Sequence, residues 1–189
     1  MEKKYEINIC GIKRQLPYIH IDDKKAFASF VVLSDSELIE VAAKELLKKI
    51  GDVDIFVTAE AKGIALTHEM TRLRGLKEFI VARKSVKSYM KDVVSESLES
   101  ITTKGVQNLF LDGIDACKIK DRKVCIVDDV ISTGESLKAL ENLVLKAGAK
   151  IVSKAAILAE GDAADRDDII FLQKLPLFNI KDNGEYEEI

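Results

Sequence analysis

The sequence is poor in the residues on which several kinds of catalytic and metal site depend. It holds only two histidines, His20 and His68, which stand far apart with no ligand spacing around them. A histidine-based triad or a zinc site is therefore not expected. The three cysteines, Cys10, Cys117 and Cys125, form no CxxC pair. We interpret them as free thiols without a catalytic role.

Long hydrophobic runs and an excess of basic charge are also missing. No apolar run approaches the length of a membrane span, and residues 1–5 lack the apolar core of a signal peptide. The formal net charge of −3 gives no overall attraction to nucleic acid. The sequence therefore predicts a cytoplasmic protein that binds neither a membrane nor nucleic acid.

What is present is the composition of an ordinary globular domain. The chain has 189 residues, of which 47% are hydrophobic and 32% charged. This length suits one domain with a sizeable core and a small subdomain. Residues 1–33 contain short alternating runs that predict a β-rich region with a hairpin. Residues 173–189 are apolar and then acidic, and we expect their first half to pack beside that region.

Between these two parts, residues 34–172 alternate strand and helix patterns, which predicts an α/β domain. Ser34 and Glu37 form a capping box that starts the first helix. The order of elements predicts an open, twisted, mainly parallel sheet with helices on both faces. The polar, serine-rich connection 85–105 is too long for an ordinary link, and we expect a flexible loop that works as a lid. Strands are expected at 54–59, 79–82, 108–111, 124–127, 150–158 and 168–172.

Residues 124–136 carry the clearest chemical signal. An apolar run typical of a buried parallel strand stops at Asp128 and Asp129, and a loop of small and hydroxyl-bearing residues leads into a helix. Such a loop brings backbone N–H groups to the positive end of a helix, which suits a phosphate monoester. The carboxylates beside it suit hydroxyls or a magnesium-bound water. Taken singly, the two acids could be ordinary solvated side chains. Ser132 or Thr133 could likewise be an ordinary helix cap.

Two further clusters follow predicted strands, and all three would gather at the rim beyond the carboxyl ends of the strands. Residues 60–63, Glu-Ala-Lys-Gly, form a small-residue turn. Such a turn lets its backbone N–H groups approach a diphosphate. Such a turn alone is more often only structural. Arg83 and Lys84, with Lys87 three residues on, form a basic cluster whose ordinary interpretation is a solvated turn.

These motifs together closely resemble those of the type I phosphoribosyltransferases, and most of all the adenine (purine) phosphoribosyltransferases. Residues 124–136 match the family signature for 5-phosphoribosyl-1-pyrophosphate: an apolar strand, two acids, a short spacer and Thr-Gly-x-Ser. The resemblance spans residues 34–172, and it implies that residues 1–33 form a hood, joined by 173–189. It also implies that the 5-phosphate is held by Ile131, Ser132, Thr133, Gly134, Glu135 and Ser136.

The resemblance also implies where the pyrophosphate lies. The run at 60–63 is similar to the family's pyrophosphate loop, although Lys62 replaces the arginine usual in adenine enzymes and loses its bidentate fork. The family's basic segment, here 83–87, reaches the pyrophosphate in part across the interface of a homodimer. The residues expected to bind pyrophosphate are Glu60, Ala61, Lys62, Gly63, Arg83, Lys84 and Lys87.

By the same resemblance, catalysis rests on acids and positioning, with no need of a nucleophile or a histidine. Asp128 and Asp129 would steady the ribose hydroxyls and lie near a Mg²⁺ ion held mainly by the substrate. The run 95–100, Ser-Glu-Ser-Leu-Glu-Ser, resembles the lid element that carries the family's general acid or base. That residue corresponds to Glu99, with Glu96 as its rival.

A purine base needs a hydrophobic slot with a stacking side chain, which Phe27, Phe30 or Phe178 would supply, although core packing is the ordinary role of each. The resemblance implies a purine salvage enzyme that uses adenine and gives AMP and pyrophosphate. Xanthine or hypoxanthine-guanine specificity is the alternative. A non-catalytic regulator that senses the sugar diphosphate is more remote, because residues 1–33 are too short and too β-like for a winged helix.

Overall fold

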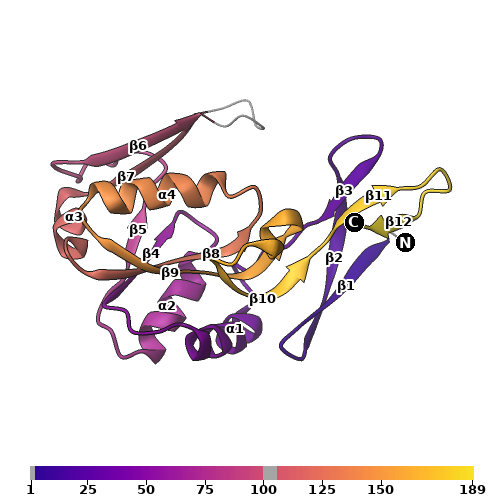
Figure 1. The fold of residues 1–189 in the computed structure, drawn as a ribbon, viewed down its shortest axis with the longest axis horizontal. Helices are drawn as coiled ribbons and strands as arrows, with labels where there is room; N and C mark the ends of the chain where they lie inside the picture. Colours follow the sequence, from indigo (N-terminus) through magenta and orange to yellow (C-terminus); the bar gives the residue numbers. More distant parts are fainter. Residues whose placement is uncertain (1–2, 100–105) are drawn as a thin grey trace.

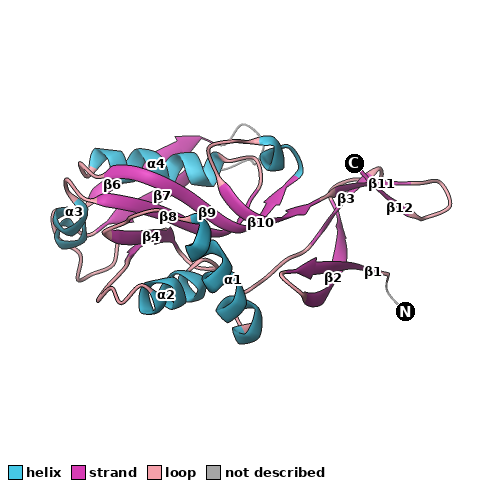
Figure 2. Cartoon of the chain, turned by 60° about the horizontal axis from the view of Figure 1, so that its bottom comes forward, coloured by secondary structure: helices cyan, strands magenta, loops and turns pink. Residues whose placement is uncertain are grey.

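The computed structural model describes residues 3–99 and 106–189, which form two parts arranged along the long axis of the molecule (Figure 1). The larger part is a parallel sheet with helices on both faces. The smaller part is an antiparallel sheet that combines strands from both ends of the chain (Figure 2). In the described residues, no helix is long and apolar enough to cross a membrane.

The elements are best given by the part to which they belong. The larger part contains the helices α1 (Ser36–Lys49), α2 (Ile64–Leu73), α3 (Gly113–Ile119) and α4 (Glu135–Lys146), and a short 3₁₀ helix at Gly161–Asp165. Its strands are β4 (Ile55–Ala59), β5 (Ile80–Ala82), β6 (Val94–Glu99), β7 (Val106–Leu111), β8 (Lys123–Ile131), β9 (Lys150–Glu160) and β10 (Ile170–Leu175). The smaller part contains β1 (Lys4–Ile9), β2 (Ile12–His20), β3 (Lys25–Ala28), β11 (Leu177–Ile180) and β12 (Tyr186–Glu188).

The main sheet has the order β10-β9-β8-β4-β5, and all of its neighbouring strands are parallel. Side chains alternate between its faces, so Phe56 packs with α1 and α2, whereas Ile55 packs with α3 and α4. Both residues are fully or almost fully buried. The apolar strands are therefore covered on both sides, and the predicted α/β fold is confirmed.

The expected strand at 108–111 exists, but its place in the parallel sheet was wrongly predicted. These residues belong to β7, which pairs antiparallel with β6 in a separate two-stranded sheet. An antiparallel bridge between Arg83 and Phe110 joins this ribbon to the end of β5. Antiparallel pairing is favoured because only six residues separate β6 from β7 in the sequence, too few for the crossover connection that parallel strands need.

The same ribbon corrects the prediction for residues 85–105. Residues 94–99 form β6, where the apolar residues Val94 and Leu98 stand an even number of positions apart, as the period of a strand allows. The serine-rich composition concealed that period. The remainder of the expected lid, residues 100–105, lies outside the described residues.

The first helix begins one residue later than the capping box predicted. Asp35 is the N-cap of α1, and its side chain accepts a hydrogen bond from the backbone N–H of Leu38. Asp35 also accepts a bidentate fork from Arg14 of β2, at 2.6 and 2.8 Å. The cap of α1 therefore also ties the smaller sheet to the larger part.

The smaller sheet has the order β1-β2-β3-β11-β12, with all of its pairs antiparallel. The C-terminal strand β11 lies between β3 and β12, so β11 and β12 both belong to the N-terminal sheet, whereas residues 173–175 belong to β10 of the main sheet. Phe178 is 1% exposed and meets Tyr5 and Tyr18 edge to face, with ring centroids 5.1 and 4.9 Å apart. Near the C-terminus, β12 pairs antiparallel with β11.

Candidate active site

The carboxyl ends of the main strands and the segment after β3 enclose one cavity of about 530 Å³. It brings together the three clusters that follow β4, β5 and β8, as the parallel order predicts. The residues that line it are Phe27, Ala28, Ser29, Phe30, Val31, Ala59, Glu60, Ala61, Lys62, Lys84, Leu109, Asp128, Asp129, Val130, Ile131, Ser132, Thr133, Gly134, Ser136, Leu137, Glu160 and Leu175.

The two acids lie inside β8, and not after it as the sequence suggested. Asp128 pairs with Ala156 of β9, and the strand continues through Val130 to Ile131. The backbone N–H of Asp129 donates to Oδ1 of Asp128 at 2.8 Å. Strand pairing through the acids was missed because aspartate is a poor strand former, and here the partner β9 extends two residues further than predicted. The sheet therefore holds the two carboxylates rigidly.

Asp129 is 1% exposed, and its charged neighbour is Lys62 of the turn after β4. Nζ of Lys62 lies 3.0 Å from Oδ2 of Asp129, without hydrogen-bond geometry. Oδ2 is thus buried and has no hydrogen-bond partner among the described residues. An acceptor in that state fits a donor from a ligand, such as a hydroxyl or a metal-bound water.

Burial and the neighbouring carboxylate raise the pKa of Asp128 well above its usual range. Burial acts first, because it disfavours the charged form, and the negative charge of Asp129 adds to it. Two acids so close together resist full ionisation. A cation or a set of hydroxyl donors that binds here would therefore relieve the repulsion.

The loop after β8 leads directly into α4. Gly134 is the N-cap of this helix and has φ +81°, a conformation that favours glycine. Ile131, Ser132, Thr133 and Ser136 line the cavity together with Gly134, whereas Glu135 does not. The predicted phosphate-binding run therefore faces the cavity at every position but one, beside the positive end of a 12-residue helix.

The turn after β4 contains a cis peptide bond between Glu60 and Ala61. Glu60 accepts a hydrogen bond from the backbone N–H of Lys84 at 2.9 Å, which lowers the pKa of its carboxyl group. Nε of Arg83 lies 3.7 Å from Oε1 of Glu60. Lys84 reaches the cavity, but neither Arg83 nor Lys87 lines it, and Lys87 donates to Ser85 Oγ at 2.7 Å.

Gly63 is required for a reason other than the one that the sequence suggested. Its φ is −74°, which any residue adopts. A Cβ at this position would lie 2.3 Å from Oγ1 of Thr58 and 3.2 Å from the carbonyl oxygen of Val127. Gly63 therefore allows the turn to pack closely against β4 and β8, and it does not line the cavity.

The aromatic candidates divide between two places. Phe27 and Phe30 line the cavity, with Phe30 only 6% exposed. Phe178 lies in the core of the smaller sheet and not in the cavity. The segment from β3 onward is therefore the part of the hood that covers the cavity.

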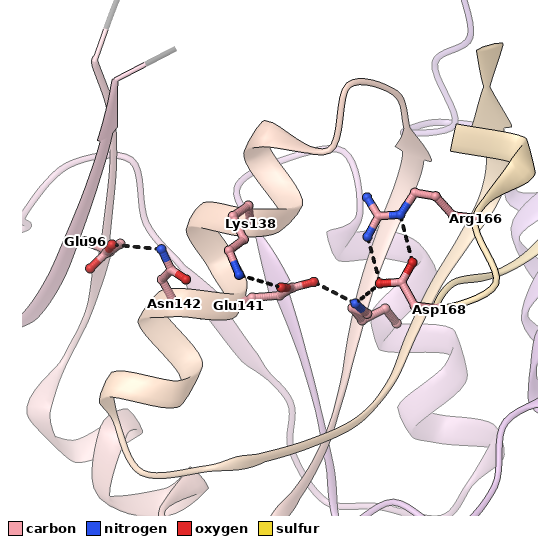
Figure 3. Close-up of polar contacts among 7 residues, drawn as sticks. Glu96, Lys138, Glu141, Asn142, Arg166 and Asp168 are labelled. Atoms are coloured by element: carbon pink, nitrogen blue, oxygen red, sulfur yellow. Dashed lines mark hydrogen bonds and ion pairs between the residues drawn. The ribbon is translucent and has the colours of Figure 1, made fainter. Parts of the chain in front are cut away.

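The structure describes the side chain of only one of the two glutamates proposed for proton transfer. Glu96 accepts a hydrogen bond from Asn142 at 3.2 Å and lies 3.8 Å from Nζ of Lys146, so it faces α4 (Figure 3). That position is outside the cavity, and Glu96 is not suited to act on a substrate there. The backbone of Glu99 ends β6, and its side chain lies outside the part of the chain that the structure describes.

Among the lining residues that were not recognised from the sequence, two lie at the ends of neighbouring strands. Glu160 ends β9, and Leu175, its partner in the register, ends β10. Burial raises the pKa of Glu160, while the positive charge of Lys62 lowers it. An acid at the carboxyl end of a predicted strand was the available signal, but that strand was expected to end at Leu158. The cavity thus combines the turns after β4 and β8, four acids (Glu60, Asp128, Asp129 and Glu160) and an aromatic wall.

The sequence and the fold resemble those of known proteins from one family. The model of the phosphoribosyl transferase domain family matches residues 33–184. A hypoxanthine/guanine phosphoribosyltransferase of Methanococcus voltae is 31% identical over 161 residues, which are 83% of this chain and 82% of that protein. An adenine phosphoribosyltransferase of Thermosipho africanus is 32% identical over 133 residues, 67% of this chain and 72% of that protein.

Solved structures show the same fold. The adenine phosphoribosyltransferase from Thermoanaerobacter pseudethanolicus has a TM-score of 0.64 at 22% identity, covering 92% of this chain and 96% of its own. The enzyme of that name from Rhodothermus marinus has a TM-score of 0.65 at 21% identity, covering 92% and 94%. At these identities the likeness concerns the fold, and it confirms the type I architecture. The matched family model and the relatives above 30% identity show that the chain belongs to the phosphoribosyl transferase domain family.

Proposed function

We propose that this protein is a purine phosphoribosyltransferase that transfers the phosphoribosyl group of 5-phosphoribosyl-1-pyrophosphate to a purine base and releases pyrophosphate. The observation that carries the proposal is that Asp128 and the buried Asp129 lie in one cavity between two turns that suit anions. An activated ribose phosphate has a phosphate at each end and hydroxyls between them. Its chemistry therefore matches the order of groups along the cavity.

The donor would lie across the rim of the sheet. Residues 131–136 would hold the 5-phosphate at the N-terminus of α4. Asp128 and Asp129 would accept hydrogen bonds from the ribose hydroxyls. Lys62 and Lys84 would face the pyrophosphate, and Lys62 would then exchange its contact with Asp129 for one with the leaving group.

Mg²⁺ belongs to this proposal as the cofactor. The buried, unpaired Oδ2 of Asp129 fits a metal-bound water, and no three acidic or metal-ligating side chains converge on a metal-sized site in the described residues. Most ligands would therefore come from the substrate, with Asp128 and Asp129 as nearby acids. When bound, Mg²⁺ supplies positive charge to the departing pyrophosphate.

Transfer would proceed by loosening of the C1–O bond, with the electron pair leaving on the pyrophosphate. A nitrogen of the purine forms the new bond to C1 from the opposite face. The proton of that nitrogen passes to a general base, for which Glu99 is the proposed residue. The cations of the turns stabilise the charge that develops on the leaving group. The hood residues Phe27 and Phe30 would hold the purine and exclude water.

The acceptor base is adenine or, as the alternative, xanthine or hypoxanthine and guanine. Adenine follows from the resemblance of the motifs at 60–63 and 95–100, and a relative named as an adenine enzyme matches the chain. Hypoxanthine or guanine is favoured by the relatives of that name, of which the one from Methanococcus voltae matches a larger share of the chain. The acid Glu160 in the cavity also bears on this choice, as argued below.

We further propose that the protein acts as a homodimer in the cytoplasm. An apolar groove of about 850 Å³ lies between α1 and α2 and includes Ile39, Ile64 and Phe79. It also includes Ala61 of the pyrophosphate turn, so a second copy seated there would lie beside the site. Sedimentation analysis tests this proposal. A dimer that dissociates in the Ile64→Lys variant is expected, and a fully active monomer at micromolar concentration would contradict it.

The experiment that tests the proposed function supplies 5-phosphoribosyl-1-pyrophosphate and Mg²⁺ with adenine, hypoxanthine, guanine or xanthine in turn. Nucleotide formation is followed by chromatography. Turnover with at least one purine is expected. Tight binding of the sugar diphosphate without turnover on any purine would instead support the non-catalytic regulator.

A further inference from the structure

We propose that Arg166 is a positioning residue for the phosphate loop, defined here as residues 131–136. The proposal rests on the proposed function, which assigns this loop to the 5-phosphate. In our account, the guanidinium of Arg166 packs behind Gly134 and holds the loop backbone in the shape that receives the phosphate. Arg166 lies between the 3₁₀ helix and β10, and none of the sequence motifs includes it.

The contact is made at the N-cap of α4. A Cβ built on Gly134 would lie 2.7 Å from Nη1 of Arg166, closer than real Cβ atoms come to a neighbour. The guanidinium therefore occupies the space into which a side chain at 134 would extend. Gly134 lines the cavity and Arg166 does not. Arg166 thus supports the loop from behind, and the backbone separates it from the substrate.

Asp168 fixes the plane of the guanidinium. Nε of Arg166 donates to Oδ1 of Asp168, and Nη2 donates to Oδ2, both at 2.8 Å (Figure 3). This planar fork uses two of the three guanidinium nitrogens, and the third, Nη1, is the atom beside Gly134. The fork therefore sets the direction in which Nη1 points. A lysine would keep the positive charge but lose this alignment.

Asp168 is in turn tied to the helix that follows the loop. Nζ of Lys154 in β9 contacts Oδ2 of Asp168 and also Oε1 of Glu141 in α4, the latter at 2.9 Å. The side chains of Lys154 and Glu141 are only 16% and 13% exposed. Lys138 lies 3.5 Å from the other oxygen of Glu141 (Figure 3). Because partly buried pairs are screened less than exposed ones, this network can hold α4 relative to β9.

The arrangement fixes the loop at both ends. Its first end continues β8, which is paired with β9 up to Ile131. Its second end is the N-terminus of α4, which the contacts of Glu141 with Lys154 hold, while Arg166 fills the space behind Gly134. Loss of Arg166 would leave a glycine-containing loop free to change shape. The phosphate would then have to order the loop when it binds, and the free energy of that ordering would weaken its affinity.

The test separates donor binding from chemistry. Arg166→Ala, Arg166→Lys and Asp168→Asn are compared with Arg122→Ala, which removes an exposed arginine at the opposite, amino end of β8. For each, kcat and the two KM values are measured, together with calorimetric binding of 5-phosphoribosyl-1-pyrophosphate in Mg²⁺. Calorimetry needs no turnover, so it tests Arg166 even if the proposed function fails on every purine.

For Arg166→Ala we expect the KM and Kd of the sugar diphosphate to rise about tenfold, with kcat and the KM of the base within about twofold, because binding is lost equally in the ground state and the transition state. Asp168→Asn should show the same pattern more weakly, Arg166→Lys should recover part of the affinity, and Arg122→Ala should match the unmodified protein. A fall in kcat together with an equal rise in both KM values overturns the proposal. An unchanged Kd for the sugar diphosphate also overturns it.

A double substitution provides an independent check on the contact itself. Gly134→Ala introduces the Cβ that would meet Arg166, in addition to the strain at φ +81°. In the Arg166→Ala background that collision is absent, so the loss of affinity caused by Gly134→Ala should be smaller. Strictly additive losses in the two backgrounds would contradict a direct contact.

Discussion

Lys62 Nζ lies 3.0 Å from the buried Oδ2 of Asp129, so the turn after β4 and the acidic pair of β8 meet at the cavity. These two segments stand far apart in the sequence, and adjacent parallel strands bring them together. The Lys62 side chain is 47% exposed and that of Asp129 is 2% exposed. The lysine is therefore free to move toward an anion, whereas the acid is held in place.

This pairing predicts the effect of Asp129→Asn. The change removes a buried negative charge that would accept bonds from the ribose and the metal-bound water, so kcat/KM should fall by at least about a hundredfold, as for loss of other preorganised groups. The fold should survive, because the repulsion from Asp128 is also removed. Circular dichroism and a melting temperature within about 5 °C of the unmodified protein would establish this. Unchanged kinetics would exclude Asp129 from the site.

The raised pKa of Asp128 predicts a pH dependence of stability in the free protein. A carboxyl group whose pKa is raised on folding binds more protons in the folded state. Its contribution to the free energy of unfolding is therefore present at low pH and is lost as the pH rises above the ordinary carboxyl value of about 4. Urea unfolding should be measured between about pH 4 and the raised pKa of Asp128, about 7. The free energy of unfolding of Asp128→Asn should decline less with pH than that of the unmodified protein. Parallel pH curves for the two proteins would contradict this origin.

The close packing of Gly63 predicts a structural defect in the turn. Gly63→Ala would place a Cβ 2.3 Å from Oγ1 of Thr58. We expect the free energy of unfolding to fall by about 1–3 kcal/mol, the usual cost of overpacking. Gly51→Ala is the matched control, because nothing lies within 4 Å of a Cβ there. Adding Thr58→Ala to Gly63→Ala should restore part of the stability; no recovery would argue against this clash.

Glu160 predicts an effect on the choice of base. As a carboxylate it only accepts hydrogen bonds, and guanine offers N1–H and N2–H side by side, whereas adenine presents the acceptor N1 beside its amino group. Glu160→Gln should therefore shift the guanine-to-adenine ratio of kcat/KM toward adenine by about tenfold, the scale of one hydrogen bond to a charged group. The KM of the sugar diphosphate should change little. An unaltered ratio would remove Glu160 from base selection.

The sequence predicted most of the rim because the signals there are local. The run from Val124 to Ser136 contains its own strand, acids, loop and helix, and residues 60–63 follow an apolar strand in the same way. These segments needed only the rule that parallel strands end at one edge. Their placement around one cavity agrees with that expectation.

What was missed depends on contacts that are distant in sequence. The acids lie within β8 because β9 continues beside them, and pairing with a partner overrides the poor strand propensity of aspartate. Residues 94–99 form a strand because β7 offers them a partner, although their composition indicates a loop. Arg166 meets Gly134 only because the chain returns to the same edge of the sheet after β9. No local pattern specifies such contacts.

Phosphoribosyl transfer is tested by measuring pyrophosphate and nucleotide together in one reaction with 5-phosphoribosyl-1-pyrophosphate, Mg²⁺ and the preferred purine. We expect one pyrophosphate to be released for each nucleotide formed, and both products to be lost in Asp129→Asn. Pyrophosphate release that needs no purine, or nucleotide formation that persists undiminished in Asp129→Asn, would contradict this expectation.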